Sequence, residues 1–529
     1  MWFTFELTFY EKDMNTMNNR TILDLNNKEA RKLLIKPKNY CNLSLPKYFD
    51  FKPILDFVKS TVGGKSMDSC LATNISKSKK KIWPSNFDDV NYKFLVNKDG
   101  RYAFRPFQII NPYYYYFFVC LLTKKSNWSQ IITRFSQFYD SHIDVVSMPC
   151  IPKAHANEVA TAINNWYTDF EQQSIEYSLD YKYMFITDIT SCYGSIYTHS
   201  IAWAMHGKQV AKQHIGDHNL LGNQIDDFMQ HMQFNQSNGI PQGNMVSDFV
   251  AELVLGYADK LLADKLANKG INEYKVLRYR DDYRIFSNNK IELEKIALTL
   301  QEVLSGLNFQ INSSKTKFSE SIIFDSIKQD KLYYQSVLPL YKNQDKSVVS
   351  AINSAEGQLF YILQFSKKYP NSPTVQKLLT KFYAWYAANQ NMENIIVLTA
   401  ILVDIIMDNP RSFQVGTAIL SSFISNLHTS KEQADLLNRM YKRLSELPDQ
   451  GVLQLWLQRI TTKINIKVLM YTEKLCRIVE GQPDVQIWNN TWLDSRYTSG
   501  FPLHLMLNNT ILQSLQPTMG LNEFDVFEY

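Results

Sequence analysis

The decisive stretch of this chain reads LRYRDDYRIF and runs from Leu277 to Phe286. Its outer residues are of types that favour strands, and the polar break between them predicts a tight β-hairpin with Asp281 and Asp282 at an exposed tip. Because two adjacent like charges repel each other, this tip requires a cation. Mg²⁺ takes oxygen ligands, usually one or two carboxylates together with substrate phosphates. The stretch therefore predicts a second carboxylate elsewhere in the chain, and a nucleotide.

Length and composition describe an ordinary soluble globular protein. The chain has 529 residues, of which 45% are hydrophobic and 20% are charged, and this length predicts roughly two to four domains. Its net charge of +5 is compatible with a nucleic-acid partner without requiring one. The six cysteines are scattered and form no C-x-x-C pair, which argues against a zinc site or a disulfide framework and favours a reducing compartment.

The sequence pattern also argues against a membrane span and a signal peptide. The longest apolar run, Ile395 to Met407, contains Asp404 and is too short to cross a bilayer. The first residues lack a basic region followed by an apolar core, and either Met14 or Met17 is compatible with the natural start. We therefore expect a cytosolic protein.

Two cations lie on a second predicted hairpin, over residues 92–106. Two strand-like runs flank a turn that ends in Asp99-Gly100, which is a strong hairpin signal. Lys98 lies at the tip and Arg105 lies in the second strand. Both can reach over a triphosphate, Lys as a point charge and Arg as a fork that fits phosphate oxygens. Taken alone, a surface hairpin with ordinary exposed cations explains them better.

The second carboxylate is Asp188, at the end of the apolar run that begins at Tyr183. A carboxylate at the end of a buried strand is typical of a site, because the strand fixes its position while the strand end exposes it. A helix N-cap is the simpler explanation for Asp188 or Thr190. A cap does not explain why a distant Asp-Asp hairpin occurs in the same chain.

Two further segments accompany these carboxylates. The loop GIPQG, from Gly239 to Gly243, is constrained by two glycines and a proline, and it precedes a long helix that we expect Ser247 to cap. After the Asp-Asp hairpin, a helical pattern leads to a strand predicted over 309–312 and then to Lys315, which can approach a phosphate. Each segment alone is weak evidence, because loops before helices and exposed lysines are common.

From about residue 345 the chain becomes a series of amphipathic helical patterns of similar length. The patterns cover residues 350–366, 373–389, 393–408, 412–427, 431–446, 451–465 and 467–479. Such a series predicts a degenerate, HEAT-like helical-repeat array, which usually provides binding or assembly surface. We therefore expect an α+β protein with one part over residues 1–344, beginning with a helical extension over 1–90, and an all-α part over 345–529.

The order of these motifs over residues 92–317 resembles the palm and fingers of reverse transcriptases. The likeness covers both catalytic carboxylate motifs, the aromatic residue that follows the first of them, the Pro-Gln-Gly loop and the Lys-Thr element. In this chain the matching positions are Asp188, Tyr193, Gly239 to Gly243, Tyr279 to Asp282, and Lys315. The resemblance implies a right-hand palm-and-fingers fold and an RNA-directed DNA polymerase that binds dNTPs and nucleic acid.

A closer resemblance is to bacterial defence-associated reverse transcriptases of the abortive-infection (AbiK-like) group. It rests on TDITSCYGSIYTH at residues 187–199, on RPFQIINP at 105–112, and on a helical tail in place of a thumb, maturase or nuclease domain. It implies antiphage defence in the bacterial cytoplasm and assembly into trimers or hexamers. It also implies single-stranded DNA synthesis primed by a protein tyrosine, with the DNA product attached to protein, either untemplated or templated by a partner non-coding RNA.

The reverse transcriptase likeness also implies a mechanism and a set of metal ligands. The reaction would be an in-line displacement at the α-phosphorus of a dNTP, with two Mg²⁺ ions about 3.5–4 Å apart clamping the attacking and leaving oxygens. Mn²⁺ is an alternative metal. Asp188 and Asp281 would bridge the metals, Asp282 would assist, and the Ile189 carbonyl would be a further ligand.

The same likeness assigns the nucleotide contacts. Lys98 and Arg105 would hold the triphosphate, with Lys315 close to a phosphate. Tyr193 would lie under the sugar, where its ring excludes a 2′-hydroxyl, so the product should be DNA. Gln242 would line the nascent base pair through the backbone of its loop.

Two positions depart from the family pattern. Arg280 stands where many reverse transcriptases carry a small residue, and Asp248 stands where Pro is common. A large cation at the primer end suggests altered primer handling. Neither residue is an expected metal ligand, so the expectation of activity is unchanged.

Two other functions compete with this interpretation. An ordinary retroelement reverse transcriptase that copies its own RNA should carry a thumb followed by a maturase, integrase or nuclease domain, and residues 345–529 show no such motif. A catalytically silent, nucleic-acid-binding scaffold should have lost a metal carboxylate, and all three are present.

Overall fold

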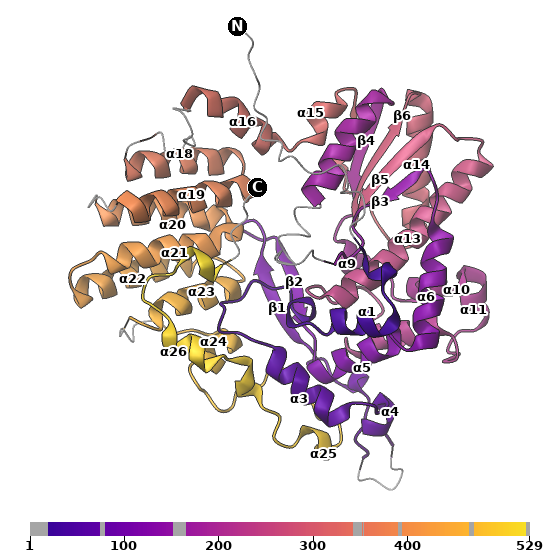
Figure 1. The fold of residues 1–529 in the computed structure, drawn as a ribbon, viewed down its shortest axis with the longest axis horizontal. Helices are drawn as coiled ribbons and strands as arrows, with labels where there is room; N and C mark the ends of the chain where they lie inside the picture. Colours follow the sequence, from indigo (N-terminus) through magenta and orange to yellow (C-terminus); the bar gives the residue numbers. More distant parts are fainter. Residues whose placement is uncertain are drawn as a thin grey trace.

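The structure is a computed structural model that describes residues 20–74, 80–151, 166–341, 352, 354–389, 394–464 and 470–524. The fold is α+β, as predicted. A mixed sheet with its helices lies on one side of the molecule, and a stack of helices lies on the other (Figure 1). A two-stranded hairpin lies between them. Residues 1–19 of the predicted N-terminal extension lie outside the described residues.

The sheet has five strands, and its centre is the hairpin predicted from LRYRDDYRIF. In spatial order the strands are β3 (Ile143–Val145), β5 (Tyr274–Tyr279), β6 (Asp282–Ser287), β4 (Tyr183–Asp188) and β7 (Lys317–Ser319). β3 runs parallel to β5, and the other neighbours are antiparallel. Tyr279 pairs with Asp282, which leaves Arg280 and Asp281 as a two-residue turn. The hairpin prediction is confirmed.

Side chains of the central strands alternate between two cores. Val276 and Ile285 belong to the main core, whereas Leu277 and Phe286 belong to a smaller core on the other face, together with Met184. Successive strand residues point to opposite faces of a sheet, so burial on both faces requires apolar residues at consecutive positions. This explains why apolar residues occur at consecutive positions, as in Val276-Leu277 and Ile285-Phe286.

The long helix after the GIPQG loop is α13 (Met245–Asn268), and it is followed after the hairpin by α14 (Lys290–Gly306). The predicted cap at Ser247 is wrong. The side chain of Asn244 caps α13, because its Oδ1 accepts from the Ser247 N–H (2.9 Å), while Ser247 lies inside the first turn. The strand predicted over 309–312 is also wrong. That segment makes one bridge, between Ile189 and Ile311, and the ladder continues only at β7.

The second predicted hairpin is confirmed as β1 (Tyr92–Asn97) paired with β2 (Phe104–Ile109). Around it and the sheet lie the helices α1 (Asn27–Leu34), α2 (Pro37–Tyr40), α3 (Lys52–Val62), α4 (Met67–Cys70), α5 (Pro112–Leu122), α6 (Lys125–Phe138), α8 (Gln173–Glu176), α9 (Cys192–Ser195), α10 (His199–His206), α11 (Lys208–Gln213), α12 (Leu221–His231), α15 (Ile322–Ser326) and α16 (Gln329–Tyr341). The six consecutive aromatics of α5, from Tyr113 to Phe118, are all buried. They therefore serve as core.

The pattern predicted over 467–479 forms a helix only from Lys474, and its residues 467–469 lie outside the described ranges. The predicted series of helices is otherwise confirmed. It comprises α18 (Ala355–Lys368), α19 (Pro373–Asn389), α20 (Ile395–Asp408), α21 (Phe413–Ser425), α22 (Ser430–Leu444), α23 (Gly451–Thr461) and α24 (Lys474–Val479). From α18 to α23, most helices pack against the next helix and the next but one (Figure 1). This packing is characteristic of stacked helical pairs. We call α18 to α23 the helical stack.

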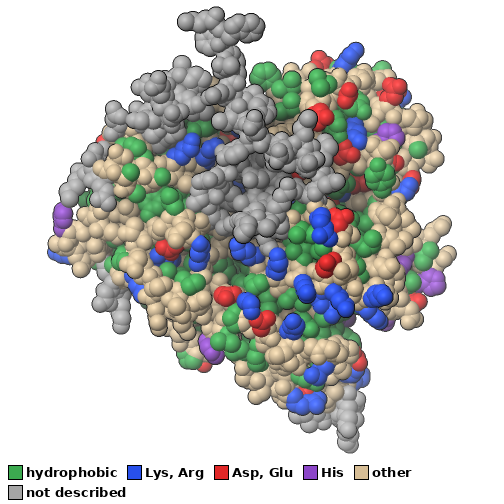
Figure 2. Space-filling model, in the orientation of Figure 1, with side chains coloured by type: hydrophobic (Ala, Val, Ile, Leu, Met, Phe, Trp, Pro, Cys, Tyr) green, Lys and Arg blue, Asp and Glu red, His purple; other side chains and the backbone are tan. Residues whose placement is uncertain are grey.

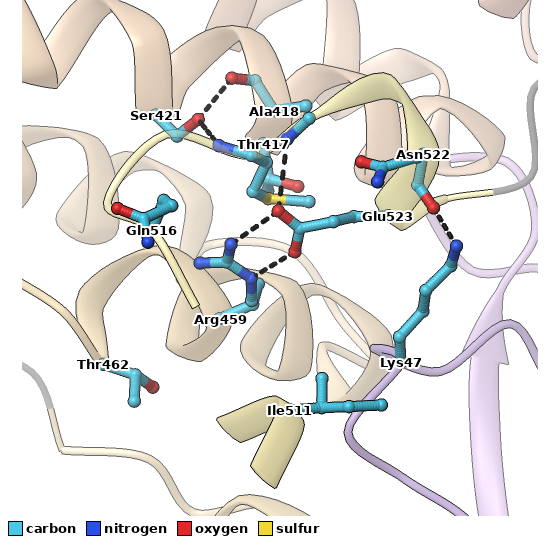
Figure 3. A network of polar contacts seen from close by, with 12 residues as sticks. Lys47, Thr417, Ala418, Ser421, Arg459, Thr462, Ile511, Gln516, Asn522 and Glu523 are labelled. Carbon is cyan, nitrogen blue, oxygen red and sulfur yellow. Dashed lines mark hydrogen bonds and ion pairs between the residues drawn. The ribbon is translucent and has the colours of Figure 1, made fainter. Parts of the chain in front are cut away.

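After α24 the chain runs back over the N-terminal segment, with α25 (Ser495–Thr498) and α26 (Asn509–Ser514) on the way. Backbone hydrogen bonds join Asp494 to Cys70 (2.9 Å) and Asn508 to Tyr48 (2.7 Å). Glu523 then anchors the chain to the helical stack through two hydrogen bonds from the buried Arg459, of 2.6 and 2.7 Å (Figure 3). Residues 494–523 thus connect the N-terminal segment to the helical stack.

Within the described ranges, no helix combines the length and the apolar character that crossing a membrane requires.

Candidate active site

The three predicted carboxylates meet at one end of the sheet. Strand pairing places Asp188 opposite Asp282, and the Ile189 N–H donates to the Asp281 carbonyl (3.0 Å). Asp188 is buried, and the two hairpin carboxylates are half-buried. The exposed tip predicted for Asp281 and Asp282 is therefore wrong, because the end of β4 packs beside the turn.

The backbone is strained on both sides of this meeting point. Ser191 has φ +49° and Arg280 has φ +52°, a left-handed conformation that few residues other than Gly, Asn and Asp adopt. The first bend ends β4 abruptly after Asp188, and the second forms the hairpin turn. Strain of this kind clusters at functional sites. The alternative in which Asp188 or Thr190 caps a helix is excluded, because Ser191 occupies the N-cap position of α9 and makes no side-chain capping bond.

The carboxylates affect one another electrostatically. Burial raises the pKa of Asp282 to about 6, with the charges of Asp281 and Asp188 adding to the effect. Burial and the charge of Asp188 also raise the pKa of Asp281. Crowded carboxylates of this kind favour a bound cation.

Lys315 supplies the cation in this structure. Its ammonium pairs with Asp188 Oδ2. Burial lowers the pKa of Lys315, but the hydrogen bond to Asp188 and the charges of the three carboxylates outweigh burial and raise it. The predicted Lys315 is therefore brought into the site, where it contacts a carboxylate.

The fit of the carboxylates to divalent metal ions rests on two observations. Asp188 Oδ1 is buried and has no hydrogen-bond partner, so it is an oxygen ligand still to be satisfied. Among the described residues, no donor bonds the Ile189 carbonyl. Within the described ranges, no three His, Cys, Asp or Glu side chains are already close enough together to hold a metal ion. Metal binding would therefore require Asp188 to exchange Lys315 for the ion.

The two cations of the β1–β2 hairpin also interact electrostatically with the carboxylates. Burial lowers the pKa of Lys98, and the charges of Arg105 and Lys315 lower it further, while Asp188 and Asp281 act in the opposite sense. Lys98 is thus close enough to Arg105, Lys315 and these two carboxylates for their charges to act on it. Figure 2 shows that Lys and Arg side chains also form a band across this face of the molecule, between the helical stack and the sheet.

The two residues that depart from the family pattern form one ion pair. Arg280 Nη2 lies 2.8 Å from Asp248 Oδ2, and Arg280 Nη1 donates to the Tyr193 hydroxyl (3.1 Å). That hydroxyl in turn donates to Asp248 Oδ1 (2.6 Å). Arg280 is therefore engaged with Asp248 and Tyr193, which revises the suggestion that its side chain acts on the primer. Sequence reasoning treated the two departures separately, and only the fold shows that they compensate each other.

The GIPQG loop packs against β2. The Gln242 carbonyl accepts from the Gln108 N–H (2.9 Å), and the Gly243 carbonyl accepts from the Asn42 N–H (3.0 Å). The Gln242 carbonyl thus joins the loop to the β1–β2 hairpin. Because this carbonyl is already bonded, Gln242 would have to contact the nascent base pair through its other atoms.

A buried charge cluster beneath the hairpin was not predicted from the sequence. Arg278, on β5, is 1% exposed and donates to Asp259 Oδ2 (2.8 Å) and Glu252 Oε2 (3.0 Å) on α13. It also donates to the Arg280 carbonyl (3.2 Å), inside the strained turn. The i, i+7 spacing of Glu252 and Asp259, with only apolar residues and glycine between them, was the signal that could have revealed it.

Residues 130–345 match the family described as reverse transcriptase (RNA-dependent DNA polymerase). The matched range includes all three carboxylates and Lys315. The chain therefore contains a reverse transcriptase domain, and the protein is an RNA-directed DNA polymerase. No curated protein matches the sequence.

Several solved structures are distantly similar. Apo telomerase from Candida tropicalis is 12% identical, with 80% of this chain and 73% of that chain covered and a TM-score of 0.32. For the same protein truncated from the C-terminal domain, the identity is 13%, the coverage 50% and 53%, and the TM-score 0.29. Telomerase from Candida albicans with a fragment of telomeric RNA is 11% identical, with 77% and 68% covered and a TM-score of 0.27. Similarity at this level transfers no property of telomerase to this chain.

Proposed function

We propose that Asp188, Asp281 and Asp282 form a two-metal site at which this polymerase adds dNTPs to a growing DNA strand. The observation that carries the proposal is the pairing of β4 with β6, which brings Asp188 opposite Asp282 and leaves Asp188 Oδ1 without a partner. Mg²⁺ or Mn²⁺ bound there would activate the attacking hydroxyl and stabilise the charge of the leaving pyrophosphate.

In this proposal the protein contributes mainly position and charge. Asp188 and Asp281 would hold the metals, with help from Asp282 and the Ile189 carbonyl. Lys98 and Arg105, on the β1–β2 hairpin, bind the triphosphate. Lys315 pairs with Asp188 in this structure, and with metal ions bound there it would be free to approach a phosphate. We also propose that the chain is divided into a polymerase part over residues 1–344 and an all-α part over 345–529.

A divalent metal should stabilise the folded protein measurably. A ligand at ten times its Kd adds about 1.4 kcal/mol to the free energy of unfolding, which should raise Tm by about 1–3 °C. We expect this rise for the wild type in Mg²⁺ or Mn²⁺ relative to EDTA, and a smaller one for Asp188→Asn. Thermal unfolding measures it. The matched control is Asp264→Asn, on an exposed ion pair with Lys260. An equal rise in wild type and Asp188→Asn would place the ion elsewhere.

Tyr193 is proposed to exclude ribonucleotides, because its hydroxyl is fixed by Asp248 and Arg280. Removing the ring in Tyr193→Val should lower the preference for dNTPs over rNTPs by about 10–100-fold. The ratio of kcat/KM values for dATP and ATP measures this. Tyr139→Val is the matched control, since Tyr139 is 80% exposed. Unchanged discrimination in Tyr193→Val would remove Tyr193 from this role.

The biological role follows from the resemblance to abortive-infection reverse transcriptases. We propose that the enzyme acts in antiphage defence in the bacterial cytoplasm, as a trimer or hexamer, and that a tyrosine of the protein primes synthesis, untemplated or on a non-coding RNA. Sequencing nucleic acid that co-purifies with the protein, with and without protease treatment, tests priming and template together. DNA linked to a peptide would support protein priming, and only free nucleic acid would contradict it.

A further inference from the structure

The tip of the β1–β2 hairpin, which carries Lys98, is packed against the helical stack. Gly100 lies so close to the end of α20 that an added Cβ would come within 2.2 Å of the Met407 carbonyl oxygen. The side-chain amide of Asn97 donates to the Pro448 carbonyl (3.0 Å). The position of Lys98 is therefore fixed by residues that follow it by more than 300 positions in the sequence.

Asn371, in the turn between α18 and α19, joins two cationic residues through their backbones. Its Nδ2 donates to the Lys98 carbonyl (2.5 Å), and its Oδ1 accepts from the Arg411 N–H (3.0 Å). Its own N–H donates to Oδ1 of the fully buried Asn409 (2.6 Å). Asn371 has φ +53°, a left-handed conformation that Asn tolerates better than most residues.

Arg411 lies in the short 3-10 helix Pro410–Ser412 between α20 and α21, and its side chain is exposed. It lines a cleft of about 930 Å³ between the helical stack and the N-terminal segment. Burial lowers the pKa of Arg105, and the charge of Arg411 lowers it further, whereas Asp281 raises it. The backbone link through Asn371 therefore places Arg411 beside the tip of the β1–β2 hairpin that carries Lys98.

Three cations therefore share this region, in which Asn371 links the backbones of Lys98 and Arg411. In the described ranges, Lys98, Arg105 and Arg411 form no ion pair with a carboxylate, whereas Lys315 is paired with Asp188 and Arg280 with Asp248. Like charges held together at a cost indicate an anionic ligand. A triphosphate suits them, because guanidinium groups bind phosphate oxygens in a forked geometry.

We propose that Arg411 is a third triphosphate-binding residue, contributed by the helical stack, and that Asn371 is the positioning residue that holds Arg411 and Lys98 toward the same dNTP. This inference rests on the proposed nucleotide site at Asp188, Asp281 and Asp282. It gives the helical stack a part in the reaction itself, in addition to any assembly surface.

Two substitutions in the full-length protein test the proposal. Arg411→Gln removes the charge at similar size, and Asn371→Gly removes the bridging side chain while keeping a residue suited to positive φ. We expect each to raise KM for dNTPs about ten-fold or more, with kcat changed by less than about three-fold. The Kd of α,β-imido dATP, measured by calorimetry with Mg²⁺, should rise in parallel. Arg411→Lys should recover part of the affinity, since it restores the charge.

The matched control is Arg439→Gln, an exposed arginine on α22 of the same helical stack. It should leave KM and Kd unchanged. Unchanged KM and Kd in Arg411→Gln would overturn the inference, and so would a fall in kcat alone, which would place Arg411 on primer or product. Either result would leave the carboxylate site intact, because that site is tested independently by loss of activity in Asp281→Asn.

Discussion

Replacing Asp281 with Asn is expected to lower dNTP incorporation by about 10³-fold or more while leaving the protein folded. The loss follows because Asp281 is one of two carboxylates proposed to bridge the metals, and electrostatic stabilisation is usually the largest catalytic contribution. Folding should not suffer. Burial and the charge of Asp188 raise the pKa of Asp281, which means that its charged form is disfavoured in the native state. A neutral Asn relieves that repulsion, so Tm should stay level or rise.

Incorporation of labelled dTTP on poly(rA)–oligo(dT), and of labelled dNTPs without added template, measures the effect on activity. Thermal unfolding measures the effect on stability. Asp264→Asn is the matched control, because Asp264 pairs with Lys260 at the surface, where ion pairs contribute about 0–1 kcal/mol. Full activity in Asp281→Asn would refute the proposed site.

The second large effect is expected on stability, from Arg278→Met. Arg278 is 1% exposed and neutralises both Glu252 and Asp259. Removing one partner from a buried ion pair leaves an uncompensated charge and costs about 3–5 kcal/mol. The turn should loosen as well, since Arg278 also donates to the Arg280 carbonyl. We therefore expect a lower urea midpoint and, in the surviving folded protein, reduced incorporation.

Neutralising Glu252 and Asp259, which lose their partner in Arg278→Met, tests whether unpaired buried charge causes the loss of stability. The triple variant Arg278→Met, Glu252→Gln, Asp259→Asn should recover most of the lost stability, because no buried charge remains unpaired. Arg443→Met is the matched control, on an exposed ion pair with Glu446. A loss below about 1 kcal/mol in Arg278→Met would show that the cluster does not depend on its charges.

The sequence by itself determined the elements that depend on local pattern. The strand residues around Asp281 and Asp282 alternate between two cores. Their apolar residues therefore predicted a hairpin without any knowledge of the strands that pair with it. The helices from α18 to α23 have 3.6-residue periodicity and recognisable ends, and their predicted ranges agree closely with the observed ones. The reverse transcriptase domain was recognisable because its motifs occur in a fixed order.

Tertiary structure alone decided the contacts between segments that are distant in sequence. Asp188 acquired a lysine partner, Arg280 acquired Asp248, and Asn371 came to link the backbones of Lys98 and Arg411. Side-chain periodicity reports whether a residue is buried, but it carries no information about which residue lies opposite. The strand predicted over 309–312 failed for the same reason, because only the fold shows that this segment makes one bridge, to Ile189 just after β4. Charge pairing depends on distances of a few ångströms, and those are set by the packing of the whole chain.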